Sequence, residues 1–181
     1  MTPHSHARRT LSGLEYMRRV AAGEVESGPM VRLLGMRLAE VEHGRVTVTA
    51  ELRPEHENGL GIAHGGFAAT LLDTALGCVV NTVMPAGKIF TTLEMKINYV
   101  RAITRDSGPL TCIGTIVHAG RRTATAEGRI VDRDGTLYAH GTLTGILFLD
   151  VSGTPAGGGD AARSAAETAA FRKNTGEQTH E

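Results

Sequence analysis

The feature that most constrains the fold is one long apolar segment in the middle of the chain. Residues 66–87 contain a single charged side chain, Asp73, and Pro85 and Gly87 end the apolar run. A run of this length is typical of a helix rather than a strand. A helix that is apolar nearly all round is a buried helix, so we expect residues 66–84 at the centre of the fold.

On both sides of this helix the sequence changes to the two-residue period of β-strands. Residues 91–100 alternate strictly and predict a buried face that begins with Thr91 and Leu93. The complete set of predicted strands is 36–42, 46–52, 91–100, 108–118, 122–132 and 136–149. Within 122–132, the small residues Ala124, Ala126 and Gly128 share one face, which would let a helix pack closely.

These elements predict an α+β fold with one antiparallel sheet wrapped around one long helix. Residues 28–150 form the predicted principal domain, and residues 1–27 precede it with a short helix over 11–22. A second short helix is expected over 30–34. Residues 151–181 are rich in glycine and alanine and low in hydrophobicity, so we expect a flexible tail.

Composition excludes several classes of function. Lys+Arg and Asp+Glu are both 19, so no net charge attracts the chain to nucleic acid or to an anionic membrane. Four Phe and three Tyr are too few for a base-stacking platform. Because no apolar run spans a bilayer and the first residues lack a signal core, we expect a cytoplasmic protein. The eight His residues never have convincing metal-ligand spacing, so no metal is expected.

The segment from Asn58 to Gly66 is rich in glycine and leads directly into the long helix. Such a turn exposes backbone N–H groups and the positive end of the helix dipole, which can hold an anion or a developing oxyanion. Asp73 follows on the same helix. It could be a structural aspartate or a general base or nucleophile, and the adjacent glycine turn favours the second. Gly66 and Asp73 are roughly 10 Å apart along a helix, so a partner subunit could be needed to complete a site.

Other polar residues are candidates with an equally simple structural interpretation. Thr91 could orient a water or a substrate group, or only begin its strand. Asn58 could donate to a carbonyl, although Asn-Gly is by itself a turn signal. Four residues near strand ends could bind phosphate or be solvated surface groups: Arg101, His118, Arg121 and Arg122.

Taken together, these motifs resemble the hotdog-fold acyl-CoA thioesterases of the phenylacetic-acid-pathway (PaaI-like) type. The resemblance runs from about Gly28 to Leu149. It is carried by Asn58, by His64-Gly65-Gly66, by Asp73 and by the strand that begins at Thr91, at matching spacing. It implies hydrolysis of an acyl-CoA to free acid and CoA, without metal or organic cofactor, by homodimers or homotetramers with composite sites.

The resemblance also implies roles for individual residues. Gly65 would donate its backbone N–H to the thioester carbonyl, and Asn58 would assist there or hold water. Asp73 of a neighbouring subunit would be the base or nucleophile, and Thr91 would orient water. His64 and Gly66 would help to bind the substrate. An attacking water and an acyl-enzyme anhydride both remain open.

Two other functions are compatible with such a fold. An enoyl-CoA hydratase needs a His five residues after the helical Asp, and position 78 is Cys78, which argues against it. A non-catalytic acyl-CoA-binding or regulatory protein is the other alternative. The complete set of candidate catalytic residues favours the enzyme, and release of free thiol from an acyl-CoA would discriminate between the two.

The first prediction concerns assembly. One sheet cannot cover a helix that is apolar on so many sides, so we expect a homodimer or homotetramer. Sedimentation at micromolar concentration should show a species at least twice the 19.1 kDa chain. A monomer alone would contradict both the assembly and the composite site.

Overall fold

The computed structural model describes residues 10–149, so the tail predicted for 151–181 lies outside the described residues. The strands are β1 (Arg37–Glu42), β2 (Arg45–Ala50), β3 (Lys88–Tyr99), β4 (Leu110–Ala119), β5 (Thr123–Val131) and β6 (Leu137–Leu149). The helices are α2 (Gly13–Ala21), α3 (Pro29–Leu33) and α4 (Gly65–Thr82), with short 3-10 turns η1 (Pro54–His56) and η2 (Arg105–Ser107). Each predicted strand and helix is present, with bounds that differ by no more than three residues.

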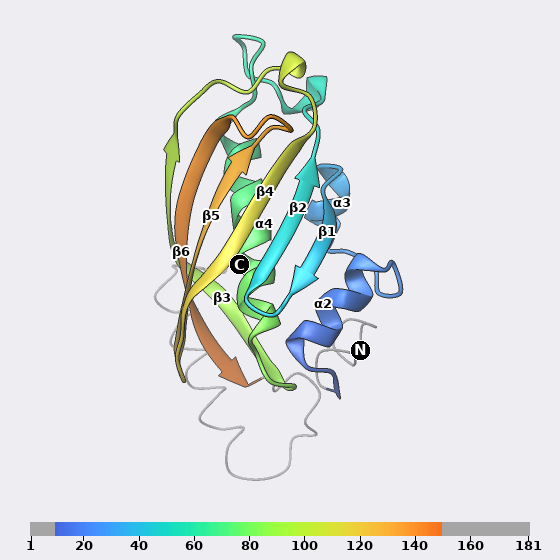
Figure 1. Cartoon of the computed structure of the whole chain (residues 1–181), viewed down its shortest axis with the longest axis vertical. Coiled ribbons are helices and arrows are strands. Elements are labelled where there is room, and N and C mark those ends of the chain that lie inside the picture. The colour runs from blue at the N-terminus through green and yellow to red at the C-terminus, as the bar shows by residue number, and fades with distance from the viewer. Residues whose placement is uncertain (1–9, 150–181) are drawn as a thin grey trace, which may run out of the picture. The chain divides into compact units, whose positions relative to one another are not determined.

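All six strands form one antiparallel sheet in the order β1-β2-β4-β5-β6-β3. The helix α4 lies along one face of this sheet (Figure 1). This confirms the predicted α+β fold with an antiparallel sheet around one long helix. In the described part of the chain β1 and β3 are the edges of the sheet, and β3 pairs only with β6.

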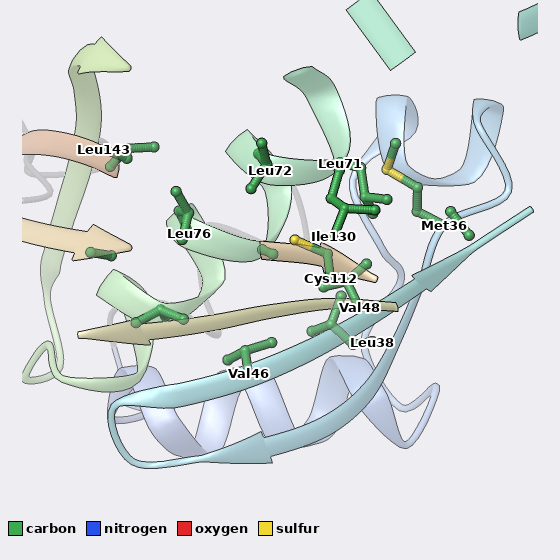
Figure 2. Close-up of a cluster of buried hydrophobic side chains, with 14 of the residues drawn as sticks. Met36, Leu38, Val46, Val48, Leu71, Leu72, Leu76, Cys112, Ile130 and Leu143 are labelled. Atoms are coloured by element: carbon green, nitrogen blue, oxygen red, sulfur yellow. The ribbon is translucent and has the colours of Figure 1, made fainter. Parts of the chain in front are cut away.

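The core lies between α4 and the sheet. Leu71, Leu72 and Leu76 of α4 are fully buried and point toward apolar side chains of the strands (Figure 2). The opposite side of α4 is different, because Asp73 is exposed and Thr74 and Cys78 are only half-buried. Eleven of the 18 residues of α4 are buried, so the predicted burial of this helix is confirmed except on the side that carries Asp73.

Small residues in the sheet set how closely α4 packs. A Cβ atom on Gly114 of β4 would lie 2.8 Å from Cγ2 of Val79, and one on Gly128 of β5 would lie 2.8 Å from Cδ2 of Leu76. Ala124 and Ala126 are fully buried beside them. The predicted close approach through small side chains on 122–132 is thus confirmed, and β4 contributes to it as well.

The N-terminal helix α2 packs against both β1 and α4. Ser12 caps its start by accepting a hydrogen bond from the Glu15 N–H at 3.2 Å. Tyr16, Met17 and Val20 are its buried side chains. Part of the apolar surface of α4 that the sequence assigned to a partner subunit is therefore covered by α2 of the same chain.

Gly13 makes this docking possible. Its N–H donates to the carbonyl oxygen of Met84 at 2.9 Å, and a Cβ atom on it would overlap the carbonyl oxygen of Asn81 at the end of α4. We predict that Gly13→Ala displaces α2 and destabilises the fold by about 1–3 kcal/mol, as overpacking does elsewhere. Urea unfolding measures this, with Gly59→Ala as the control because nothing lies within 4 Å of its Cβ position. Equal stability of the two variants would contradict the tight docking of α2.

Candidate active site

Asp73 is the only charged residue of α4. Its Oδ1 accepts a hydrogen bond from the Thr92 hydroxyl of β3 at 3.1 Å. The carboxylate is exposed in the single chain because α4 turns its leucines toward the sheet and this residue away from it. A buried helix predicts that Asp73 is buried with it, and for the single chain this expectation is wrong. What remains is a solvated carboxylate held by one hydroxyl group.

A β-bulge in β3 decides which threonine meets Asp73. Thr92 pairs with Gly145 and Glu94 pairs with Thr144, so Leu93 is an extra residue in the ladder. Such a bulge reverses the alternation of faces beyond it. Thr91 is exposed and Leu93 is 60% exposed, so the prediction that they share the buried face is wrong. The strict alternation of residues 91–100 contains no signal of the bulge, which depends on pairing with β6.

The turn before α4 is built around Asn58. Its Oδ1 accepts a hydrogen bond from the Leu60 N–H at 2.9 Å, and its backbone N–H donates to the carbonyl of Ile62 at 2.8 Å. Gly61 has the positive φ, 72°, that this tight turn requires. The simple turn interpretation of Asn58-Gly59 is therefore confirmed, and the amide NH2 group of Asn58 is its remaining donor.

His64 is the N-cap of α4, and its Nδ1 accepts a hydrogen bond from the Gly66 N–H at 2.9 Å. The resemblance implied that Gly66 helps to bind the substrate. Its N–H already donates to His64, so this N–H is not free for the substrate. Gly65 is the first residue of the helix, so its N–H has no acceptor within the helix. Among residues 10–149 the structure gives this N–H no other acceptor, and Gly65 is exposed.

Tyr99, at the end of β3, was not predicted as a site residue. Its hydroxyl donates to the carbonyl oxygen of Gly65 at 3.1 Å. The Ala63 N–H also donates to the carbonyl of Ile103, just beyond β3, at 2.9 Å. These two bonds tie the start of α4 to the segment that follows β3. No local motif indicates them, because they join residues far apart in the sequence.

Asp73 and Gly65 open onto two different pockets. The pocket beside Asp73 has a volume of about 410 Å³ and lies between α4, α2 and residues 26–31. The pocket beside Gly65 has a volume of about 330 Å³ and is also lined by His64, Tyr99 and Arg101. Eight residues separate Gly65 from Asp73, which is about 12 Å along a helix. One chain therefore does not bring the two candidate groups to one reacting atom.

The four residues predicted to bind phosphate do not form one cluster. The backbone N–H of Arg101 donates to Tyr138 at the start of β6, whereas the carbonyl of Arg122 accepts from Leu147 near its end. Nine residues of strand separate these points by about 30 Å. Arg121 lies with Arg122 in the turn between β4 and β5, and His118 lies near the end of β4. Lys88, which the sequence analysis did not single out, joins them, with its Nζ 3.4 Å from the Arg121 carbonyl.

The cysteines differ in their surroundings. Burial in the core, with a smaller effect from nearby Cys78, raises the pKa of the Cys112 thiol to about 12. Cys112 therefore stays protonated at neutral pH and is no nucleophile there. Cys78 is half-buried and lines the pocket beside Asp73.

Within residues 10–149 no group of three His, Cys, Asp or Glu is placed to hold a metal ion. No helix of the same residues is long and apolar enough to cross a membrane.

Comparisons with known proteins show the family of the chain. The family model of the thioesterase superfamily matches residues 60–139. A solved mutant of the phenylacetic acid degradation protein PaaI from Thermus thermophilus is 30% identical, with a TM-score of 0.60, over 66% of this chain and 98% of that chain. The E. coli PaaI protein has a TM-score of 0.66 at 22% identity, over 76% of this chain and 96% of that chain, and supports the fold. A Halobacterium salinarum protein named "Putative esterase" is 28% identical over 65% of this chain and 80% of its own length.

The fold and these matches define a hotdog-fold protein, and the chain belongs to the thioesterase superfamily. The matched residues 60–139 include Gly65, Asp73 and Thr92, and so cover the main groups of the candidate site. The family match and the esterase relative support a hydrolase that acts on thioesters in general.

Proposed function

We propose that the protein hydrolyses acyl-CoA thioesters to free acid and CoA at sites shared between two copies of the chain. The observation that carries the proposal is the arrangement on α4. The helix begins with an N–H that has no acceptor among the described residues, and it carries a single carboxylate held by Thr92. Thioester hydrolysis needs these two kinds of group, a donor for the carbonyl oxygen and a base or nucleophile for the carbonyl carbon.

In the proposed reaction the Gly65 N–H binds the carbonyl oxygen, where negative charge develops as the carbon is attacked. Asp73 either takes a proton from the attacking water or attacks the carbon itself to form an anhydride that water then opens. In both cases the C–S bond breaks and the thiol of CoA leaves. The Thr92 hydroxyl holds Oδ1, which leaves Oδ2 of Asp73 to act toward the substrate.

A second copy is part of the proposal because Gly65 and Asp73 of one chain are about 12 Å apart along the helix. The edge strand β3 is a suitable interface. It is 12 residues long, pairs only with β6 within the described chain, and carries the exposed side chains of Leu93 and Tyr99. Antiparallel pairing of β3 with its copy would continue the sheet and satisfy the unpaired backbone groups. Thr91 would then lie close to this interface, which keeps its predicted role with water open.

The same pairing would bring opposite ends of β3 together. Arg101 follows the end of β3, and Lys88, with Arg121 and Arg122 nearby, lies at its start. Antiparallel copies would therefore place cations from both ends near one another. Such a group suits the phosphates of CoA, which need cationic or N–H partners.

The main test is Asp73→Asn, which keeps the shape of the side chain and removes the base. We expect kcat per folded subunit to fall 10²- to 10⁴-fold, as loss of a general base does. The melting temperature should hardly change, because Asp73 is exposed. Release of free CoA from acyl-CoA substrates, detected with a thiol reagent, measures the rate.

Asp106→Asn is the matched control, since Asp106 is also exposed but lies in η2, away from the candidate site. It should keep the wild-type rate. If folded Asp73→Asn retains more than about a tenth of the wild-type kcat, Asp73 is not the catalytic group. Binding of acyl-CoA without release of CoA by the wild type would instead indicate a non-catalytic acyl-CoA-binding protein.

A further prediction concerns the coenzyme. Replacing Arg121 and Arg122 together with alanine should raise KM more than it lowers kcat, because phosphate contacts bind the substrate and the transition state equally. Arg101→Ala should act in the same direction. Arg133→Ala serves as the control, since Arg133 is exposed in the β5–β6 turn and pairs only loosely, at 3.8 Å, with Asp134. Unchanged KM in all variants would reject these cations as the phosphate site.

A further inference from the structure

We infer that the pocket beside Asp73 binds the acyl group, and that the N-terminal segment 13–33 sets which acyl groups it accepts. The substrate class is an apolar acyl thioester considerably larger than acetyl. This inference rests on the proposed function and adds to it a place for the acyl group and the residues that select it.

The wall of this pocket is mostly apolar. Its larger apolar side chains come from four elements around α4: Tyr16, Met17 and Val20 of α2, Val31 of α3, Leu38 of β1 and Phe90 of β3. Gly77 lies in the wall as well, and its lack of a side chain makes room for the Phe90 ring, whose Cζ would be 3.0 Å from a Cβ atom there. A pocket of about 410 Å³ with such a lining is within the range of small-molecule sites.

The charges at this pocket argue against the coenzyme as its occupant. The charged groups of its lining are the carboxylates of Asp73 and Glu26, and Glu26 pairs with Arg32 at 3.0 Å. Carboxylates repel the phosphates of CoA. The pocket beside Gly65 has the opposite character, because it contains Arg101 and the positive end of α4.

The position of Asp73 gives the pocket its place in the reaction. The carbonyl carbon that Asp73 or its water attacks is bonded directly to the acyl chain. An acyl chain therefore extends from the reacting carbon into whatever space adjoins the carboxylate. Within the described chain the apolar pocket that adjoins Asp73 is this one.

Four of these six apolar wall residues belong to α2 and α3, which the thioesterase family match over residues 60–139 does not include. The candidate groups for the chemistry lie on α4 and β3, inside the matched range. The N-terminal helices thus contribute walls of the pocket and none of the reacting groups. Selectivity can change there without loss of the catalytic residues.

The experiment changes the pocket volume at Val31. Val31 is half-buried in the wall, whereas Leu33 of the same helix is 71% exposed and does not line the pocket. The variants are Val31→Phe, Val31→Ala and the matched control Leu33→Phe. Each is assayed with acetyl-, hexanoyl-, octanoyl-, phenylacetyl- and palmitoyl-CoA, and the melting temperature is measured alongside.

We expect the wild type to prefer octanoyl- or phenylacetyl-CoA over acetyl-CoA. Val31→Phe should lower the ratio of kcat/KM for octanoyl-CoA to that for acetyl-CoA by about tenfold or more, the effect of a methylene group or two in an apolar pocket. Val31→Ala should shift the preferred length upward, and Leu33→Phe should leave the ratio as in the wild type.

The outcomes separate the two proposals. If the wild type hydrolyses acyl-CoA but both Val31 variants show the same chain-length profile as Leu33→Phe, the acyl group lies elsewhere and this inference is wrong. A wild type that prefers acetyl-CoA would also overturn it. If the wild type releases CoA from none of the substrates, the proposed function itself fails, and the assignment of the pocket fails with it.

Discussion

The packing of α4 against the sheet is the constraint on which the rest of the molecule depends. The leucines of α4 are fully buried against strands whose facing residues include Gly114, Ala126 and Gly128, so the helix approaches the sheet closely. Apolar burial of this kind is the main favourable contribution to folding. It also fixes the rotation of the helix about its axis. With the leucines facing the sheet, Asp73 faces away from it and meets Thr92 on the edge strand.

The same helix carries both halves of the candidate chemistry, and its rigidity keeps them apart. Gly65 is at the first turn and Asp73 is about two turns further on, so they open onto different pockets. The start of α4 is held by the Tyr99 hydroxyl, and Gly13 of α2 binds the carbonyl of Met84 just beyond its end. A rigid helix cannot bend to bring the two groups together. An assembly of two copies is the arrangement that we propose to join them, and the unpaired edge of β3 is available for it.

The two pockets have complementary characters. One is apolar with carboxylates at its margin, and the other contains Arg101 and the positive end of the helix. A thioester of CoA has the same two characters, an apolar acyl group on one side of the sulfur and an anionic coenzyme on the other. In the proposed assembly each site would join one pocket of each kind. The N-terminal helices would then shape the acyl side, while the superfamily residues on α4 supply the chemistry.

The sequence alone determined the features that depend on local pattern. The apolar run of 66–84 predicted α4 because its length and composition leave no other element, and alternation predicted the strands. Asp73 was found because a single carboxylate in such a run needs an explanation, and the glycine turn was found because it precedes a helix.

Tertiary structure decided what depends on pairing between distant segments. The bulge at Leu93 depends on the pairing of β3 with β6. Alternation therefore placed Thr91 on the buried face, whereas in the structure it is Thr92 that contacts Asp73. Exposure of Asp73 depends on which face of α4 meets the sheet, and the separation of Arg101 from Arg121 depends on the length of β6 between them. Residues that are close in space through strand pairing leave no periodic signal in the sequence, and for that physical reason only the folded chain shows them.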